Sequence, residues 1–324
     1  MSNTTEKTSN SLSLIKKEHR NKVLITLFLV TTLAGGGYWA VIAATSSSAP
    51  SVALALRLAY IAVLYMPVPL YTLLLSRFML GIPIPFRALL SLKHITVKKY
   101  ALVAGLFLAW AVLMIGSVAV LGWLWPEMFG HLATTNGHLV HNLEKLIGTS
   151  VNTSAMNMPP TPLAMLPLGI FGALMAGLTV NAIFAMTEEI MWRGYLAQAF
   201  AGQPFCKKYV TIGVLWGLWH IPLIALGYNY GTANALPGSV LFIGFCVVMS
   251  LVLGFVVERT RSVWLAAVLH GTLNGFSQVM LLLVVGGSSL LASSAVGVVS
   301  LVAWLVVFVG CYISTAFASV TERA

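Results

Sequence analysis

Long apolar runs, separated by short polar connections, occupy most of the chain after residue 22. A run of about 20 predominantly apolar residues is long enough to cross a bilayer as a helix. We therefore expect an all-α polytopic membrane protein with about eight transmembrane helices. The spans are expected near 23–44, 52–76, 100–125, 163–190, 209–228, 236–257, 263–285 and 290–316. The second should kink at Pro67 and Pro69, and the fourth should continue as a helix to about Phe200.

The composition supports this class. Hydrophobic residues make up 59% of the 324 residues and charged residues 8%, whereas charged residues are about a quarter of a soluble domain. The pattern divides the chain into a cytoplasmic polar tail at 1–22, an eight-helix membrane domain at 23–316 and a cytoplasmic tail at 317–324. Within the membrane domain, the core that carries the polar residues discussed below covers about 163–285.

Basic residues gather in alternate connections, and this sets the expected orientation. Of the 18 lysines and arginines, 15 lie in the N-terminal tail, in the C-terminal tail and in the connections after spans two, four and six. The opposite connections contain only Lys145, with Arg57 near the outer end of span two. Cytoplasmic loops are the ones enriched in lysine and arginine. We therefore expect an integral protein of a bacterial inner (cell) membrane with both termini cytoplasmic.

The formal charge of +10 also raises the possibility of nucleic-acid binding. Here, however, the basic residues are scattered through loops without interleaved aromatic residues, so membrane topology explains them better and we expect no nucleic-acid partner. Cys206, Cys246 and Cys311 have neither CxxC nor Cys/His zinc spacing.

The long outer connection, 126–160, contains several histidines. His131, His138 and His141 could form a metal site, but we favour a helix over about 137–147 that rests at the membrane interface. On the other side of the membrane, the basic segment from Pro83 to Lys99 is expected to lie on the cytoplasmic leaflet.

Two ionisable residues lie at the end of the fourth span, and a third follows it closely. Glu188 and Glu189 follow an apolar run, and Arg193 comes four residues after Glu189. Ionisable residues inside a membrane span are costly to bury and are functional by default. Residues four apart share a helix face, so Glu189 and Arg193 should form a structural ion pair. Glu188 lies on another face and is left for a different role.

Two later spans carry one histidine each. Trp216 and His220 are four residues apart on span five, and His270 and Asn274 are four apart on span seven. Their distances from the basic loops suggest that these residues and Glu188 meet in the cytoplasmic half of the membrane. A carboxylate beside an imidazole can deprotonate water, and a second histidine with an asparagine can stabilise an oxyanion. Glu188, His220 and His270 could equally bind zinc.

These residues resemble the motifs of the CPBP family (also called CAAX protease or Abi), which contains the intramembrane proteases of the Rce1 type. Its three motifs, EExxxR, FxxxH and HxxxN, correspond here to Glu188 through Arg193, Trp216 through His220 and His270 through Asn274. The resemblance covers about 185–280, with Trp216 in place of phenylalanine. It implies an endopeptidase that cleaves a membrane-associated protein or peptide within the lipid bilayer.

The resemblance also implies roles for the motif residues. Glu188 and His220 would activate water, and His270 and Asn274 would stabilise the oxyanion or help to bind metal. Glu189, Arg193 and Trp216 would support the site. No cofactor is required by the pattern, although zinc fits it.

Two other functions are compatible with the sequence. One is a non-catalytic bacteriocin-immunity or scaffold protein built on the same fold. The other is a proton-coupled transporter, which is disfavoured because the sequence shows no internal repeat.

Overall fold

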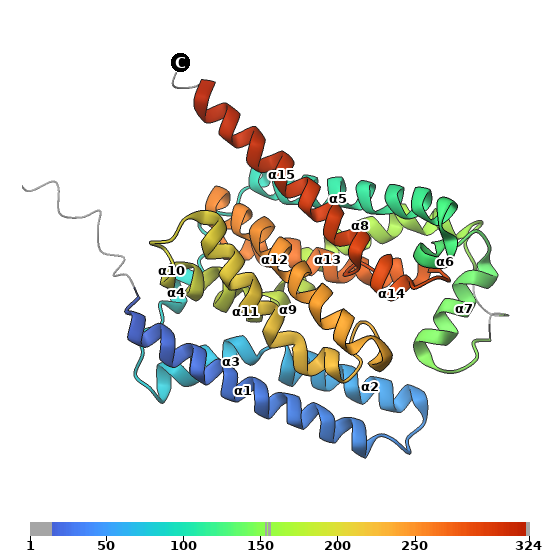
Figure 1. The fold of residues 1–324 in the computed structure, drawn as a ribbon, viewed down its shortest axis with the longest axis horizontal. Helices are drawn as coiled ribbons and strands as arrows, with labels where there is room; N and C mark the ends of the chain where they lie inside the picture. Colours follow the sequence, from blue (N-terminus) through green and yellow to red (C-terminus); the bar gives the residue numbers. More distant parts are fainter. Residues whose placement is uncertain (1–14, 153, 155–156, 322–324) are drawn as a thin grey trace, which may run out of the picture.

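The structure is a computed structural model that describes residues 15–152, 154 and 157–321, and this part of the chain is predominantly helical. Most of the long helices run side by side along the long axis of the molecule (Figure 1). They are α1 (Lys17–Ala44), α5 (Val97–Leu124), α11 (Phe205–Ala225), α12 (Ala235–Thr260), α13 (Val263–Leu283) and α15 (Val298–Thr321). The expected all-α membrane class is confirmed.

Six segments of the described chain are long and apolar enough to cross a membrane by length and composition. They are α1, Pro50–Phe78, α5, α11, Thr232–Thr260 and α13. The bent pair Pro162–Leu178 and Val180–Ala199 becomes a seventh span if it is counted as one, and α15 contains a shorter apolar helix, Val298–Ser314. The first seven runs expected from the sequence fall on these spans, whereas the eighth, 290–316, is helical as α15 only from Val298.

The second span is irregular at the expected place. It consists of α2 (Pro50–Tyr60), the single π-helical turn η1 (Ile61–Tyr65) and α3 (Val68–Phe78). Pro67 and Pro69 have no backbone N–H to continue an α-helical ladder. Just before them, the Met66 N–H donates to the Ile61 carbonyl five residues back, at 2.8 Å. The ladder therefore changes register where the prolines begin.

The fourth span is not the continuous helix that we expected. It is divided into η2 (Pro162–Ala164), α8 (Met165–Leu178), α9 (Val180–Glu189), the π-helical turn η3 (Ile190–Leu196) and α10 (Ala197–Ala199). Its two halves meet at 56° around Thr179, whose φ and ψ are −121° and −109°. The Thr179 hydroxyl donates a hydrogen bond to the Met175 carbonyl at 2.8 Å, which gives this carbonyl a partner next to the break.

Close packing against α13 accompanies this bend. Gly177 of α8 lies so near Thr272 that a side chain there would clash. A Cβ on Gly271 would lie 2.7–2.9 Å from the Asn181 and Ala182 backbone at the start of α9. Both halves of the fourth span therefore pack directly against α13. This contact leaves no room for a larger residue at Gly177 or Gly271.

The connections differ in part from the prediction. Helix α1 begins at Lys17 and α15 ends at Thr321, so both enter the predicted tails, while 1–14 and 322–324 lie outside the described residues. The expected surface segment before α5 has only one short helix, α4 (Phe86–Leu89).

The helix predicted in the outer connection is confirmed as α7 (Asn136–Ile147). Short elements surround it at the same end of the molecule. They are α6 (Pro126–Phe129), β1 (His131–Leu132), its antiparallel partner β2 (Val284–Val285), and α14 (Ser289–Ala292).

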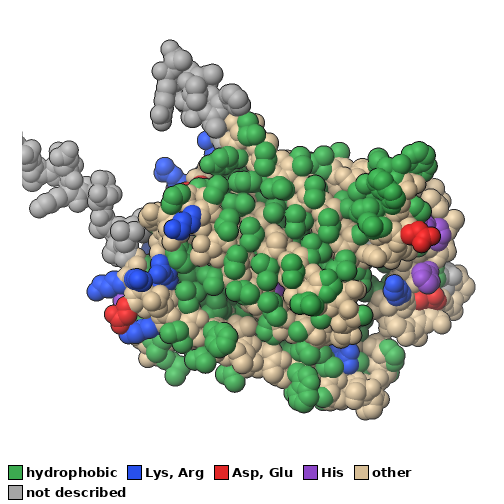
Figure 2. Space-filling view, in the orientation of Figure 1, with side chains coloured by type: hydrophobic (Ala, Val, Ile, Leu, Met, Phe, Trp, Pro, Cys, Tyr) green, Lys and Arg blue, Asp and Glu red, His purple; other side chains and the backbone are tan. Residues whose placement is uncertain are grey.

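The two ends of the bundle differ in charge. Most of the lysine and arginine side chains visible in Figure 2 lie at the end that carries the start of α1, and hydrophobic side chains cover the middle of the visible face. Glutamate and histidine side chains are prominent at the opposite end, where α7 lies. The basic loops that alternate along the sequence are therefore gathered at one end of the folded helical bundle.

Candidate active site

The fourth span presents its ionisable residues at the junction of α9 and η3. Glu188 and Glu189 end α9, and Arg193 lies inside the π-helical turn. All three are buried, with 4%, 0% and 1% of their surfaces exposed. A single π-helical turn within a helix is rare and is frequently found at functional sites.

Glu189 is shared between two cationic or potentially cationic groups. Its Oε1 atom lies 3.1 Å from an Arg193 guanidinium nitrogen and 3.0 Å from Nδ1 of His270. The ion pair expected from the i,i+4 spacing is therefore present. The sequence did not reveal its second half, because the bond to His270 joins residues 81 positions apart.

Glu188 is held by a different helix. Its Oε2 atom accepts a hydrogen bond from the Trp216 indole nitrogen at 2.9 Å. The Arg193 guanidinium lies over the Trp216 ring, 4.3 Å from its centroid. Trp216 thus fixes one oxygen of Glu188 and also covers the buried cation.

His220 is fixed within its own helix and among aromatic rings. Its Nδ1 atom lies 3.0 Å from the Trp216 carbonyl oxygen one turn earlier. The centroids of the Trp219 and Phe242 rings are 4.4 and 4.6 Å from that of the imidazole. These contacts hold His220 in place from α11 and α12.

The hydrogen bonds of the two histidines assign their tautomers. A backbone carbonyl oxygen can only accept a hydrogen bond, and the same is true of an ionised carboxylate. Nδ1 must therefore carry the hydrogen both in His220, which faces the Trp216 carbonyl, and in His270, which faces Glu189. In a neutral imidazole, Nε2 is then left with a free lone pair. When neutral, both histidines can therefore act as bases or ligands through Nε2, and either can donate from Nε2 only when it is protonated.

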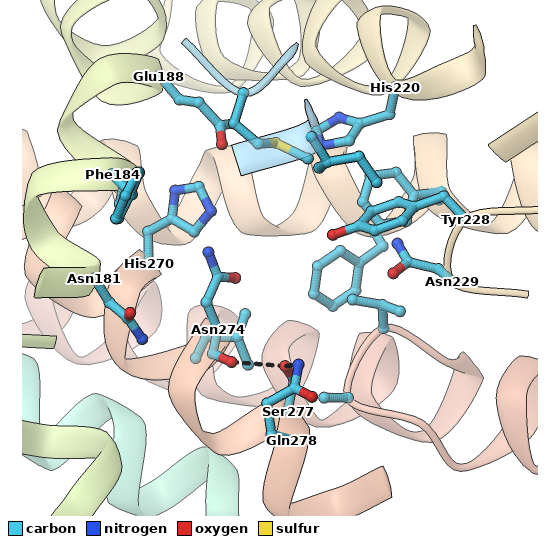
Figure 3. Close-up of a pocket in the computed structure, with 18 of the residues that line it drawn as sticks. Asn181, Phe184, Glu188, His220, Tyr228, Asn229, His270, Asn274, Ser277 and Gln278 are labelled. Atoms are coloured by element: carbon cyan, nitrogen blue, oxygen red, sulfur yellow. Dashed lines mark hydrogen bonds between the residues drawn. The ribbon is translucent and has the colours of Figure 1, made fainter. Parts of the chain in front are cut away.

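The side chains predicted from the sequence line one cavity of about 400 Å³. Glu188, His220, His270 and Asn274 all face it (Figure 3). The Asn274 carboxamide is exposed to the cavity, and no hydrogen bond holds it within the described structure. Residues from α9, α11 and α13 thus meet around a space large enough for part of a peptide.

The cavity extends away from the basic end of the bundle. It reaches Tyr228 and Asn229, which follow α11, and Ser294 to Val296, which follow α13 and α14. His220 is five residues from the end of α11 at Ala225, or about 7–8 Å along the helix. His220 is therefore nearer to this end of its helix, whereas His270 is only seven residues from Val263, where α13 begins next to the basic connection.

The two metal sites considered from the sequence have no converging ligand set. Among the described residues, no group of three histidine, cysteine, aspartate or glutamate side chains is placed to hold a metal ion. Glu188, His220 and His270 share the cavity but do not form such a group. In the outer connection, the rings of His131 and His138 are 5.5 Å apart, and Nδ1 of His138 accepts a hydrogen bond from the Thr134 N–H.

Sequence reasoning missed several residues around the cavity. Tyr228, Asn229 and Gln278 line it but belong to no recognisable motif. Asn181 was not missed, because its helical spacing places it on the Glu188 face; it lines the cavity and donates to the Gly271 carbonyl at 3.0 Å. Helical spacing could indicate Asn181, whereas a loop residue such as Asn229 has no periodicity that would identify it.

Comparison with known proteins connects this geometry to a family. Residues 162–276 match the model of the type II CAAX prenyl endopeptidase Rce1-like family. The matched segment contains the bent fourth span, α11, α12 and α13 through Phe276, and thus every motif residue of the cavity. A comparison with curated proteins gave no match.

The two adjacent glutamates should differ in their effect on stability. Glu189→Gln leaves the buried Arg193 without a counter-charge, so it should lower the free energy of unfolding by about 3–5 kcal/mol. Glu188→Gln is the matched control, since its amide oxygen can still accept the Trp216 hydrogen bond. Unfolding of both purified variants in the same lipid or detergent measures the difference. Equal stability of the two variants would contradict the structural role of Glu189.

Proposed function

The chain carries an Rce1-like domain of the type II CAAX prenyl endopeptidase family at residues 162–276, and on this basis we propose that it hydrolyses peptide bonds inside the membrane. The family supports an intramembrane endopeptidase of the CAAX type acting on a membrane-associated protein or peptide. The observation that carries the proposal for this chain is the convergence of Glu188, His220, His270 and Asn274 on one cavity.

In the proposed reaction, Glu188 and His220 activate a water molecule. One Glu188 oxygen is fixed by Trp216, and Glu188 lines the cavity together with His220, whose Nε2 atom is the nitrogen left free by the bond at Nδ1. As the water oxygen attacks the peptide carbonyl carbon, its proton passes to Glu188. Glu188 then returns that proton to the leaving nitrogen as the C–N bond breaks, so the site regains its starting state.

The second pair acts on the negative charge of the tetrahedral intermediate. Asn274 can donate from its carboxamide in the neutral form. His270 already directs its Nδ1 hydrogen at Glu189, so it can donate from Nε2 only as the imidazolium. Glu189 and Arg193 then hold the His270 ring in position without contacting the substrate.

Removing the base should abolish hydrolysis. Glu188→Gln keeps the shape of the side chain but cannot accept a proton, so the turnover rate should fall by about 10²–10⁴-fold. The C-termini of membrane-associated peptides, compared by mass spectrometry in cells that produce either form at equal levels, give the readout. New C-termini should appear with the wild type and disappear with Glu188→Gln.

Glu258→Gln is the matched control for that experiment. Glu258 pairs with Lys208 at the basic end of the bundle, away from the cavity, so its loss should leave the new C-termini unchanged. Identical C-termini with the wild type and Glu188→Gln would reject the proposed base. Such a result would favour a non-catalytic immunity or scaffold protein, and proton-driven solute flux without new C-termini would favour a transporter.

We further propose that the hydrolysis does not depend on a resident metal, in line with the absence of a three-ligand group among the described residues. Purified wild type should contain far less than one metal ion per chain, and His270→Ala should not change that content. Elemental analysis of both proteins measures it, and activity after treatment with a chelator is the second readout. Stoichiometric zinc in the wild type that disappears in His270→Ala would reject this mechanism and favour the zinc alternative.

The proposed orientation places the basic end of the bundle, and with it both termini, in the cytoplasm of a bacterial cell. Single cysteines at positions 46 and 94, in a background without the native cysteines, test it because both positions are exposed and lie on opposite sides in this orientation. A membrane-impermeant thiol reagent added to intact cells should label position 46 only. Labelling of position 94 instead would invert the orientation.

A further inference from the structure

The connection between α11 and α12 is a tight, well-anchored turn. Gly227, Asn229 and Gly231 all have positive φ, at 97°, 67° and 76°. The Gly231 N–H donates to the Gly227 carbonyl at 2.9 Å, which closes the turn. The Tyr230 hydroxyl donates to the Val296 carbonyl at 2.7 Å and ties the turn to the connection before α15.

The Asn229 backbone conformation is unusual. Asn229 and Arg261 are the two non-glycine residues with positive φ in the described part of the chain. This left-handed region favours glycine, and asparagine tolerates it better than most residues with a side chain. Glycine already occupies the two neighbouring left-handed positions of the turn. A side chain at position 229 thus has a conformational cost that glycine would avoid.

The turn brings two polar side chains to the cavity. Tyr228 and Asn229 both line it and point toward it opposite His270 and Asn274 (Figure 3). Neither side chain has a hydrogen-bond partner in the described structure. By contrast, the hydroxyls of Tyr65 and Tyr230 both donate to backbone carbonyls.

The Tyr228 hydroxyl remains a hydrogen-bond donor over the whole useful pH range. Burial, and after it the negative charge of Glu188, raises the pKa of Tyr228 to about 12. The phenol is therefore neutral at physiological pH and presents an O–H group.

The rest of the cavity wall is polar but carries little charge. No lysine or arginine is among the described residues that line the cavity, and Glu188 is its one carboxylate. Asn229, Asn274 and Gln278 contribute carboxamides, each of which can donate and accept. Peptide N–H and C=O groups need this combination of partners. Leu58, Ile61, Ala62 and Met66 add an apolar part of the lining, which suits uncharged side chains.

We propose that Tyr228 and Asn229 bind the backbone of an extended, uncharged peptide segment and position its carbonyl between Glu188 and Asn274. This inference rests on the proposed endopeptidase function for its class of ligand. It makes the two residues positioning residues for substrate rather than groups that take part in proton transfer.

Asn229→Gly separates this role from a structural one. Glycine suits the left-handed backbone, so the variant should be at least as stable as the wild type while losing the carboxamide. Arg261→Gly makes the same kind of change at the other left-handed position, which caps the end of α12. Tyr228→Phe removes only a hydroxyl.

Binding is measured in the Glu188→Gln background, so that it does not depend on turnover. The probe is a pool of capped decapeptides of alanine, glycine, leucine, phenylalanine and serine, each with one photoreactive benzophenone, and crosslinking is titrated in lipid nanodiscs. Asn229→Gly and Tyr228→Phe should each raise the peptide concentration that gives half-maximal crosslinking by roughly 5–10-fold, as expected for a lost hydrogen bond. Arg261→Gly should leave it unchanged. A pool with glutamate in place of serine should bind more weakly than the uncharged pool.

Two results would overturn the proposal. One is equal crosslinking of Asn229→Gly and its parent; the other is a parent protein that captures no peptide from the uncharged pool. Hydrolysis by the wild type is scored separately from the new C-termini in cells. If the wild type hydrolyses peptides but Asn229→Gly binds them as its parent does, only the positioning role is rejected. If peptides bind but are not hydrolysed, the endopeptidase function is rejected and the cavity is a peptide-binding site.

Discussion

A charge buried among apolar helices must be balanced inside the protein, and the Glu189 carboxylate provides most of that balance here. One of its oxygens contacts both the Arg193 guanidinium and the His270 imidazole. Removing any member of this trio would leave a charged or polar group unmatched in a medium of low dielectric constant. The position of α13 relative to the fourth span therefore depends on an electrostatic contact as well as on packing.

The same contact connects architecture to chemistry. Glu189 accepts a hydrogen bond from Nδ1 of His270, so Nε2 is the ring nitrogen left for a substrate or water. The Trp216 carbonyl has the same effect on His220. The close approach of Gly271 to the backbone at Asn181 sets the spacing between the helices that carry these groups. Tautomer, ring orientation and helix spacing are thus fixed before any substrate enters, which is what preorganised catalysis requires.

Much of this organisation could be predicted from the sequence because it is local or periodic. Hydrophobic runs predicted the spans, and the four-residue spacings predicted the Glu189–Arg193 pair and the groups that face the cavity. The break at Thr179 could not be predicted, since its neighbourhood contains no proline and its shape depends on α13. The Glu189–His270 bond was equally inaccessible, because nothing local relates positions so far apart in the chain. The sequence around Asn229 predicts only a loop, and it does not indicate the positive φ of this residue.

The buried charges also have a consequence for how the protein is made. A segment that carries Glu188, Glu189 and Arg193 is poorly suited to enter lipid alone, because each charge near the centre of a helix adds about 2.5–3.5 kcal/mol to the cost of insertion. Its partners on α11 and α13 are synthesised later. Stable integration of this span must therefore wait for the helices that follow, so biogenesis of the membrane domain is cooperative rather than helix by helix.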